Sequence, residues 1–230
     1  MDVDAAKRAA GEAAAGLIGD GARVGLGTGT TAYWFIVALA DRVRDGLRVS
    51  GVATSEATER LAAGLDIPLV ELDADGLDVA VDGADVVDPE LRLIKGGGGA
   101  MLREKIVAAA ARRFVVVIDD SKLRDTLGGT VPAELLPFGA QHTLALLDAT
   151  GGRFQLRTER DGGGARSDNG NLLADGEYSR IDDPEGLAAR LDAIPGVLGH
   201  GLFLGMADIV IVGYPDGHVE QRTAAHAVGA

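Results

Sequence analysis

The chain has 230 residues, of which 47% are hydrophobic but only 4% aromatic, and its formal net charge is −13. A core of Ala, Val, Leu and Ile suits helices packed on a parallel sheet, and 230 residues suffice to bury it. The charge disfavours nucleic-acid and membrane partners, the absence of Cys excludes disulfides, and no segment reaches the ~18 apolar residues of a membrane span. We expect a cytoplasmic protein.

Helix and strand signals alternate over the first 130 residues, a pattern typical of βαβ units in a mostly parallel sheet. The predicted helices are 4–18, 31–43, 55–63 and 100–111. The predicted strands are 23–26, 47–53, 68–72, 77–82, 113–118 and a last one at 207–213. The predicted fold class is α/β, with a Rossmann-like sheet that carries helices on both faces.

Between residues 131 and 206 the predicted order becomes βαββαβ, which is the ferredoxin-like arrangement. Strands are predicted at 134–138, 153–158, 171–179 and 197–204, and helices at 140–148 and 184–194. Glycine-containing segments at 162–164 and 168–171 join the two middle strands as a long hairpin connection. We therefore predict a main domain formed by 1–130 and 207–230, with a smaller α+β domain inserted at 131–206.

A glycine-rich segment at residues 25–31 joins a predicted strand to a helix. The free N–H groups and the dipole of a helix N-terminus favour a phosphate, and three threonine hydroxyls add further donors. The candidate phosphate ligands are Thr28, Gly29, Thr30 and Thr31. Thr30 stands where a dinucleotide fingerprint needs its third glycine, and no Gly-Lys-Ser/Thr sequence follows, so neither NAD nor a Walker loop is indicated. A tight turn with a threonine cap is the alternative.

Asp82-Gly83-Ala84-Asp85 follows an apolar strand, and ligands of open α/β sheets bind at the carboxyl ends of the strands. The alternative is ordinary Asp-Gly turn chemistry. A divalent metal is disfavoured because Lys95 belongs to the same cluster, no His lies nearby, and two aspartates form an incomplete shell. We predict binding or catalytic roles for this segment and no metal.

Lys95 is followed by Gly96, Gly97, Gly98 and Gly99. Four consecutive glycines are costly to order, because each adds backbone freedom that folding must remove. Close approach of backbone N–H groups to an anion explains this sequence better than a flexible linker does.

Glu104 is predicted to lie on an apolar helix face. Its neighbours three and four positions away are Ala100, Met101, Val107 and Ala108. Burial raises the pKa of a carboxylate toward the range of a general base, whereas Lys95 and the helix N-terminus oppose that shift. The pattern makes Glu104 the candidate base; a solvated glutamate on the helix surface is the alternative.

Lys122 follows the strongly apolar strand at 113–118, again at a carboxyl end, where its ammonium could neutralise an anionic substrate. A surface turn is the alternative. The four histidines, at 142, 200, 218 and 226, are dispersed without ligand or triad spacing, and we assign them no catalytic role.

In their order and spacing these motifs resemble those of ribose-5-phosphate isomerase of the A type, over nearly the whole chain. The matching segments are 27–31, 82–85, 95–98, 103–105, 121–122, 168–171, 194–197 and 201–203. The resemblance implies interconversion of ribose 5-phosphate and ribulose 5-phosphate, without a cofactor, by a homodimer or homotetramer.

The resemblance also implies roles for the residues. Glu104 would move a proton through an enediolate, Lys95 and the loop of Gly96, Gly97 and Gly98 would stabilise negative oxygen, and Asp82 and Asp85 would handle hydroxyls. The remaining substrate-binding candidates are Thr28, Gly29, Thr30, Thr31, Gly83, Ala84 and Lys122. Two alternatives stay open: a coenzyme A transferase relative with a glutamate nucleophile, and a sugar-phosphate sensor domain.

Overall fold

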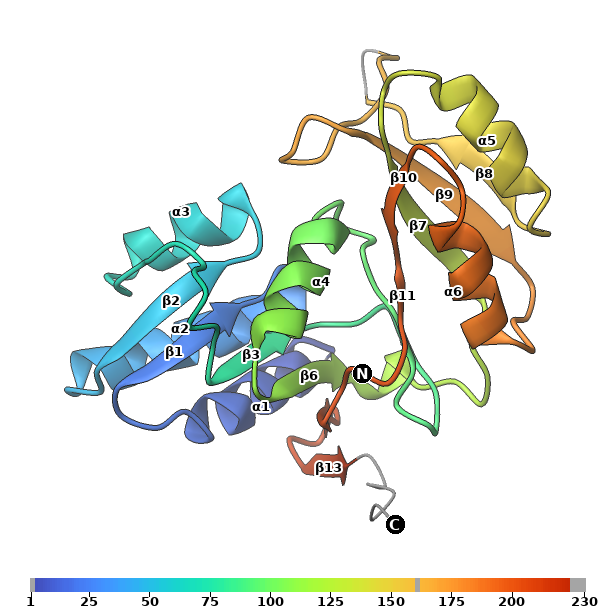
Figure 1. Ribbon diagram of the computed structural model, residues 1–230. Coiled ribbons are helices and arrows are strands. Elements are labelled where there is room, and N and C mark those ends of the chain that lie inside the picture. Colours follow the sequence, from blue (N-terminus) through green and yellow to red (C-terminus); the bar gives the residue numbers. More distant parts are fainter. Residues whose placement is uncertain (1–2, 160–161, 224–230) are drawn as a thin grey trace, which may run out of the picture. The chain divides into compact units, whose positions relative to one another are not determined.

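The computed structural model describes residues 3–159 and 162–223 (Figure 1). They group into two compact units, which we describe separately. The first is formed by Met1–Gly83, Ile106–Lys122 and Gly205–Ala230, and the second by Ala84–Lys105 and Leu123–Leu204. Within the described ranges, no helix has both the length and the apolar character needed to cross a membrane.

A six-stranded sheet in the order β13-β12-β6-β3-β1-β2 forms the centre of the first unit. Its strands are β1 (Ala22–Leu26), β2 (Val49–Ala53), β3 (Val79–Asp82), β6 (Phe114–Asp119), β12 (Ile209–Gly213) and β13 (Val219–Thr223). All neighbours pair in parallel except β13, which is antiparallel to β12. The predicted return of the last apolar segment to the main sheet is confirmed, because β12 pairs with β6.

Helices cover both faces of this sheet, as predicted. They are α1 (Val3–Gly16), α2 (Thr30–Arg44), α3 (Glu56–Gly64) and the part of α4 (Met101–Ala110) from Ile106 onward, which belongs to this unit. Val24 and Leu26 of β1 share a core cluster with residues of α1, α2 and α3. Gly25 faces the other way, and a Cβ added there would lie 2.5 Å from a methyl group of Val107 in α4. β6, with the sequence Phe-Val-Val-Val-Ile-Asp, is buried along its whole length between these layers.

The second unit contains the predicted ferredoxin-like arrangement. Its antiparallel sheet has the order β10-β7-β9-β8. The elements follow one another as β7 (Gly129–Leu135), α5 (Ala140–Asp148), β8 (Arg153–Leu156), β9 (Leu172–Tyr178), α6 (Pro184–Asp192) and β10 (Val197–His200). A three-stranded sheet is formed by β4 (Val86–Val87), β5 (Leu93–Ile94) and β11 (Leu202–Phe203). The second unit thus includes Ala84–Lys105, whereas the domain boundaries at 131 and 206 stay a prediction.

Several predicted elements differ from the observed ones. The strand expected at 68–72 reduces to a single bridge between Gly51 and Leu69, because the chain leaves the sheet edge after one pair of hydrogen bonds. The strand expected at 134–138 begins earlier, at Gly129, and contains Pro132. Glycine and proline resemble loop residues in the sequence, although here they pair with β9. The short strands β4 and β5 and the polar edge strand β13 have no hydrophobic run and were not predicted.

The close packing of α1 on α2 depends on Gly11, which is buried between them. A Cβ at Gly11 would lie 2.5 Å from the backbone nitrogen of Phe35. Gly11→Ala should therefore lower the free energy of unfolding by about 1–3 kcal/mol, the range for overpacking, despite the better helix propensity of Ala. Gly16→Ala at the exposed end of the same helix meets no atom within 4 Å and should be neutral or slightly stabilising. Urea denaturation of both variants checks this; equal effects would contradict it.

Candidate active site

In the first unit, the candidate residues lie where neighbouring parallel strands end. β6, β3 and β1 are adjacent, so their carboxyl ends share one edge of the sheet. Thr28 follows β1, Asp82 ends β3, and Lys122 follows β6 in a short 3₁₀ helix, Asp120–Lys122. The topology thus places the predicted phosphate segment, the first aspartate and this lysine at one sheet edge.

Asp82 is only 2% exposed and holds the neighbouring loop in shape. Its Oδ1 accepts hydrogen bonds from the N–H of Thr28 at 2.9 Å and of Gly83 at 2.7 Å. Gly27 is needed at this point, because a Cβ there would lie 2.3 Å from the same carboxylate oxygen. The carboxylate is therefore fixed in position by backbone donors from the loop after β1 and from its own turn.

The hydroxyl of Thr28 belongs to a cluster of side-chain hydroxyls. Its Oγ1 lies 2.8 Å from Thr54 Oγ1, 2.8 Å from Ser55 Oγ and 3.0 Å from Thr58 Oγ1. Thr58 also donates to the carbonyl of Gly27 at 2.9 Å, so the cluster ties the loop to the start of α3. The sequence predicted a helix at 55–63 but no site role for Thr54 or Thr58; in the structure Ser55 is the N-cap of this helix.

Gly29 and Thr30 are exposed at the N-terminus of α2, whereas Thr31 is buried. Gly29 has φ +115°, a conformation that favours glycine, and no side chain caps this helix end. The first N–H groups of a helix have no partners within it, so this end offers donors to an anion. The geometry therefore suits the predicted phosphate segment, with exposed donors contributed chiefly by Gly29 and Thr30.

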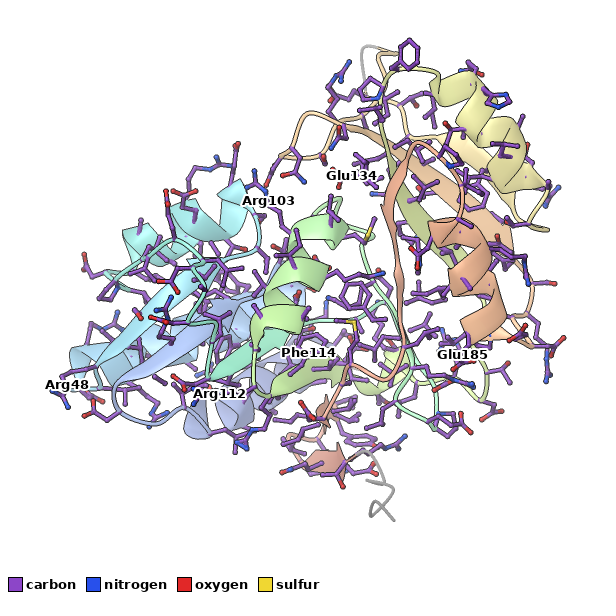
Figure 2. The ribbon with its side chains drawn as sticks, viewed as in Figure 1. Arg48, Arg103, Arg112, Phe114, Glu134 and Glu185 are labelled. Carbon is purple, nitrogen blue, oxygen red and sulfur yellow. The ribbon has the colours of Figure 1, made fainter. Side chains whose placement is uncertain are left out.

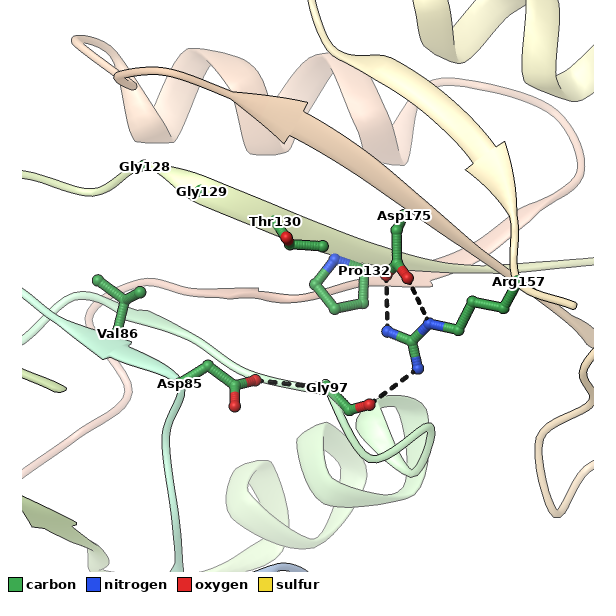
Figure 3. A pocket seen from close by; sticks show the side chains of 9 residues that line it. All are labelled: Asp85, Val86, Gly97, Gly128, Gly129, Thr130, Pro132, Arg157 and Asp175. Carbon is green, nitrogen blue, oxygen red and sulfur yellow. Dashed lines mark hydrogen bonds and ion pairs between the residues drawn. The ribbon is translucent and has the colours of Figure 1, made fainter.

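In the second unit, the glycine loop is held by Asp85, which is exposed (Figure 3). The Oδ2 of Asp85 accepts the N–H of Gly97 at 2.9 Å. Gly96 has φ +104°, and a Cβ there would lie 2.5 Å from that of Met101, so only glycine fits. Gly97 and Gly98 are exposed at the tip of the loop, which leaves their backbone accessible to a ligand.

Lys95 and Glu104 form a buried ion pair at the base of this loop. Lys95 Nζ lies 3.1 Å from Glu104 Oε2, and the two side chains are 2% and 4% exposed. The four helical neighbours on which the sequence argument depended are all buried as well. Glu104 thus lies on an apolar helix face, beside the predicted lysine. An ammonium and a carboxylate in contact out of water can exchange or share a proton with a bound substrate.

Within the first unit the structure therefore brings Thr28, Asp82 and Gly83 together, and within the second it brings Asp85 to Gly97 and Lys95 to Glu104. Among residues 3–159 and 162–223 no group of three His, Asp or Glu side chains could hold a metal ion.

Comparisons with known proteins agree with these motifs. The family model of ribose 5-phosphate isomerase A (phosphoriboisomerase A) matches residues 50–217. Ribose-5-phosphate isomerase A of Roseiflexus sp. (strain RS-1) is 50% identical over 225 residues, covering 96% of this chain and 97% of the relative. The chain belongs to the ribose 5-phosphate isomerase A family.

Solved structures of ribose-5-phosphate isomerases are also similar to this chain. That of ribose 5-phosphate isomerase A from Methanocaldococcus jannaschii has a TM-score of 0.89 at 40% identity and covers 94% of this chain and 97% of its own. A D-ribose-5-phosphate isomerase in complex with phospho-erythronic acid has a TM-score of 0.92 at 40% identity and covers 97% of this chain and all of its own. Family membership makes the protein an aldose–ketose isomerase and sets aside the transferase and sensor alternatives.

In this isomerase the first turn of α4 is anchored by Arg103, next to Glu104 (Figure 2). Arg103 donates to Asn169 Oδ1 at 2.8 Å and to the carbonyl of Asp168 at 2.9 Å. The same loop is held from β7 by Glu134, which is fully buried. Its Oε1 accepts hydrogen bonds from Ser167 Oγ, Asn169 Nδ2 and Asn171 Nδ2. The segment 168–171, which was predicted as a hairpin connection and matches a family motif, therefore also supports the helix that carries Glu104.

The lysine that follows Glu104 is held by β10 and β11. Lys105 Nζ donates to the carbonyl of His200 at 2.7 Å and to that of Leu202 at 2.9 Å. Burial lowers the pKa of Lys105 to about 8. The centre of the Phe203 ring lies 4.9 Å from Lys105 Nζ and 5.4 Å from Lys95 Nζ, so each ammonium gains a cation–π contact.

His200 is a buried neutral histidine in the same cluster. Its Nδ1 accepts the N–H of Leu202 at 3.2 Å, and its Nε2 lies 3.2 Å from Asp192 Oδ1. Burial, with the nearby charge of Lys105, lowers the pKa of His200 to about 4, although Asp192 opposes this shift.

His200 should therefore contribute an acid-sensitive part of the stability. Its pKa of about 4 in the folded protein lies below the ordinary value of 6.5, so the unfolded state binds the extra proton as the pH falls. The contribution is present above pH 6.5 and is lost between pH 6.5 and 4, by about 3 kcal/mol. His200→Gln should flatten the fall in unfolding free energy over that window. The matched control is His142→Gln on the exposed face of α5, which should keep the wild-type slope; an unchanged slope in His200→Gln would contradict the assignment.

Proposed function

We propose that this isomerase interconverts D-ribose 5-phosphate and D-ribulose 5-phosphate with Glu104 as the group that moves the proton between C1 and C2. The observation that carries the assignment is the buried contact of Glu104 with Lys95 at the base of the glycine loop. A carboxylate on an apolar helix face accepts a proton more readily than a solvated one, and the lysine beside it supplies a positive charge that offsets new negative charge on the substrate.

In the forward direction, Glu104 removes the proton from C2 of the open-chain aldose. The electron pair of the broken C–H bond forms a C1–C2 double bond, and negative charge develops on the oxygen at C1. Lys95 and the backbone N–H groups of the exposed loop, Gly97 and Gly98, stabilise this enediolate. Glu104 then returns the proton to C1, and a proton moves from the oxygen at C2 to the oxygen at C1, which yields the ketose. No oxidant, metal or organic cofactor enters the balance.

Asp82 and Asp85 are proposed to orient the hydroxyls and to assist ring opening and transfer between the two oxygens. Both carboxylates have one oxygen fixed by a backbone N–H, which gives each a defined direction. Gly83 and Ala84 link them and are proposed to contact the substrate through the backbone.

Gly29, Thr30, Thr31 and Lys122 are proposed to bind the phosphate, with Gly96 shaping the loop beside the sugar. The hydroxyl of Thr28 already contacts three other hydroxyls, so its proposed contribution is to shape the phosphate loop.

Glu104→Gln tests the proposed base directly. The amide keeps the size of the side chain but cannot accept the proton, so kcat should fall by roughly 10² to 10⁴, the usual range for a general acid–base group. Turnover of ribose 5-phosphate is followed by absorbance. The matched control is Glu59→Gln on the exposed surface of α3, which should retain wild-type kcat.

Folding of Glu104→Gln is checked by circular dichroism and by calorimetric binding of phospho-erythronic acid. Near-normal turnover in a folded, ligand-binding variant would remove Glu104 from the proposed role. The assays are run with and without a chelator, and loss of wild-type activity on chelation would contradict a mechanism without metal.

We also propose that the protein is cytoplasmic and works as a homodimer or homotetramer. The cysteine-free sequence has no need of an oxidising compartment. In the second unit, Leu136 at the end of β7 and Leu198 on the neighbouring β10 are each 42% exposed, and Phe138 is 88% exposed. Exposed apolar side chains on neighbouring segments are typical of an interface, and a second copy of the chain is the proposed partner.

Light scattering should therefore give the mass of two or four chains. Phe138→Asp should shift the mass toward the monomer, because the new charge would be buried unpaired in the interface. The matched control is Val219→Asp on the edge strand β13, where the native side chain is 37% exposed; this variant should leave the mass unchanged. A monomeric wild type would contradict the proposal.

A further inference from the structure

Arg157 follows β8 in the second unit, and its guanidinium joins that strand to the glycine loop. Its Nη1 donates to the carbonyl of Gly97 at 3.1 Å, and its Nη2 donates to that of Gly96 at 3.1 Å. Figure 3 shows the side chain between the loop and β9, at the wall of a cavity of about 560 Å³ that Asp85 and Gly97 also line.

Asp175 of β9 fixes the direction of this guanidinium. Arg157 Nε donates to Asp175 Oδ2 at 2.7 Å, and Nη2 donates to Asp175 Oδ1 at 2.6 Å, which is the two-pronged geometry of a strong arginine–carboxylate pair. β8 and β9 are paired next to this contact, through Gln155 with Asp175 and Leu156 with Ala174. Arg157 therefore directly follows a paired strand of the sheet, and its Nη1 and Nη2 contact the loop.

The loop is consequently held on two sides. Asp85 accepts the N–H of Gly97, while Arg157 donates to the carbonyls of Gly96 and Gly97. The carbonyl of Gly96 also accepts the N–H of Gly99 at 3.0 Å, which closes the turn. Because the C=O and N–H of a trans peptide point in opposite directions, the bond to the Gly97 carbonyl directs the N–H of Gly98 away from the guanidinium.

We infer that Arg157, aligned by Asp175, is a positioning residue for the isomerase reaction, acting through the glycine loop. It fixes the Gly97–Gly98 peptide so that the Gly98 N–H is available to the negative oxygen of the substrate, and it holds the loop that begins at Lys95. The inference rests on the proposed role of this loop in stabilising the enediolate. Four glycines cannot set that direction by themselves, since each has a wide range of backbone conformations.

Arg157→Lys and Arg157→Met test this inference. Lysine keeps the charge but lacks the planar fork that reaches Asp175 and two carbonyls together, so both variants should lower kcat by about 10- to 100-fold, the cost of a misplaced catalytic group. KM for ribose 5-phosphate should change by less than about threefold, because the loss falls on the transition state. The matched controls are Arg153→Lys and Arg153→Met, at an exposed arginine at the start of β8, which should retain wild-type kcat.

Two further measurements separate positioning from support of the fold. Millimolar guanidinium should restore part of the kcat of Arg157→Ala but not that of Glu104→Gln, because it can occupy the vacated site beside Asp175. In addition, Asp175→Asn should lower kcat. The double variant Asp175→Asn, Arg157→Met should have the same kcat as Arg157→Met alone, since the two side chains act through one shared contact.

The outcomes are distinct from those that test the proposed function. If the wild type turns over ribose 5-phosphate and the folded Arg157 variants match the Arg153 variants in kcat, the positioning role is wrong. Loss of thermal stability with unchanged kcat per folded molecule would also overturn it, as would the absence of rescue by guanidinium. If the wild type itself does not turn over ribose 5-phosphate, the proposed function fails first.

Discussion

The buried ion pair of Lys95 with Glu104 is the interaction on which the rest of the second unit's site depends. Two opposite charges that are each almost fully removed from water are stable only in mutual contact, and removal of one partner from such a pair typically costs about 3–5 kcal/mol. The two residues are close in the sequence, yet one begins a glycine loop and the other lies in a helix. Their contact therefore requires the loop to turn sharply before α4 begins.

The sharp turn explains why glycine is required and why glycine alone is insufficient. Gly96 adopts a positive φ against Met101, where any side chain would collide. A loop with that freedom would sample many conformations unless other groups fix it, and each fixing contact comes from a different element. Asp85 holds it from the β3–β4 connection, Arg157 from the end of β8, and Gly201 accepts the N–H of Lys95 from the chain before β11. The flexibility needed for the turn is thus offset by hydrogen bonds from ordered parts of the chain.

The placement of Asp82 at a strand end and of Glu104 on an apolar helix face could be predicted from the sequence, whereas the supporting contacts could not. Asp82 follows a hydrophobic run, and Glu104 stands among apolar residues at helical spacing, so local pattern identified both. Arg157 and Glu134 look like ordinary charged residues of a strand. Their contacts with the glycine loop and with segment 168–171 arise because β8 and β7 pair with β9, which brings together residues that are distant in the chain, and a single sequence carries no signal for such pairing. The prediction of a strand at 68–72 was wrong for the converse reason. Local composition did not reveal how soon the chain leaves the sheet edge.

An acidic protein that binds an anionic substrate must overcome electrostatic repulsion, and the charges near the glycine loop show one part of how it can do so. With a net charge of −13, the protein as a whole does not attract a sugar phosphate, so binding must rely on local groups. Two cations beside the glycine loop are each matched by a carboxylate, Lys95 by Glu104 and Arg157 by Asp175. In the proposed mechanism the loop would therefore contribute oriented dipoles more than net charge, which suits an enediolate whose charge exists only transiently.

The permanent charge of the phosphate requires a different source. The proposed source is Lys122 together with the N-terminus of α2, which no side chain caps, and both follow strands at the carboxyl edge of the main sheet. A helix N-terminus and an ammonium both favour a group that stays negative throughout the reaction. In the proposed mechanism, Lys122 and the N-terminus of α2 supply charge for binding and the glycine loop supplies dipoles for catalysis, so the two requirements fall on different segments of the chain.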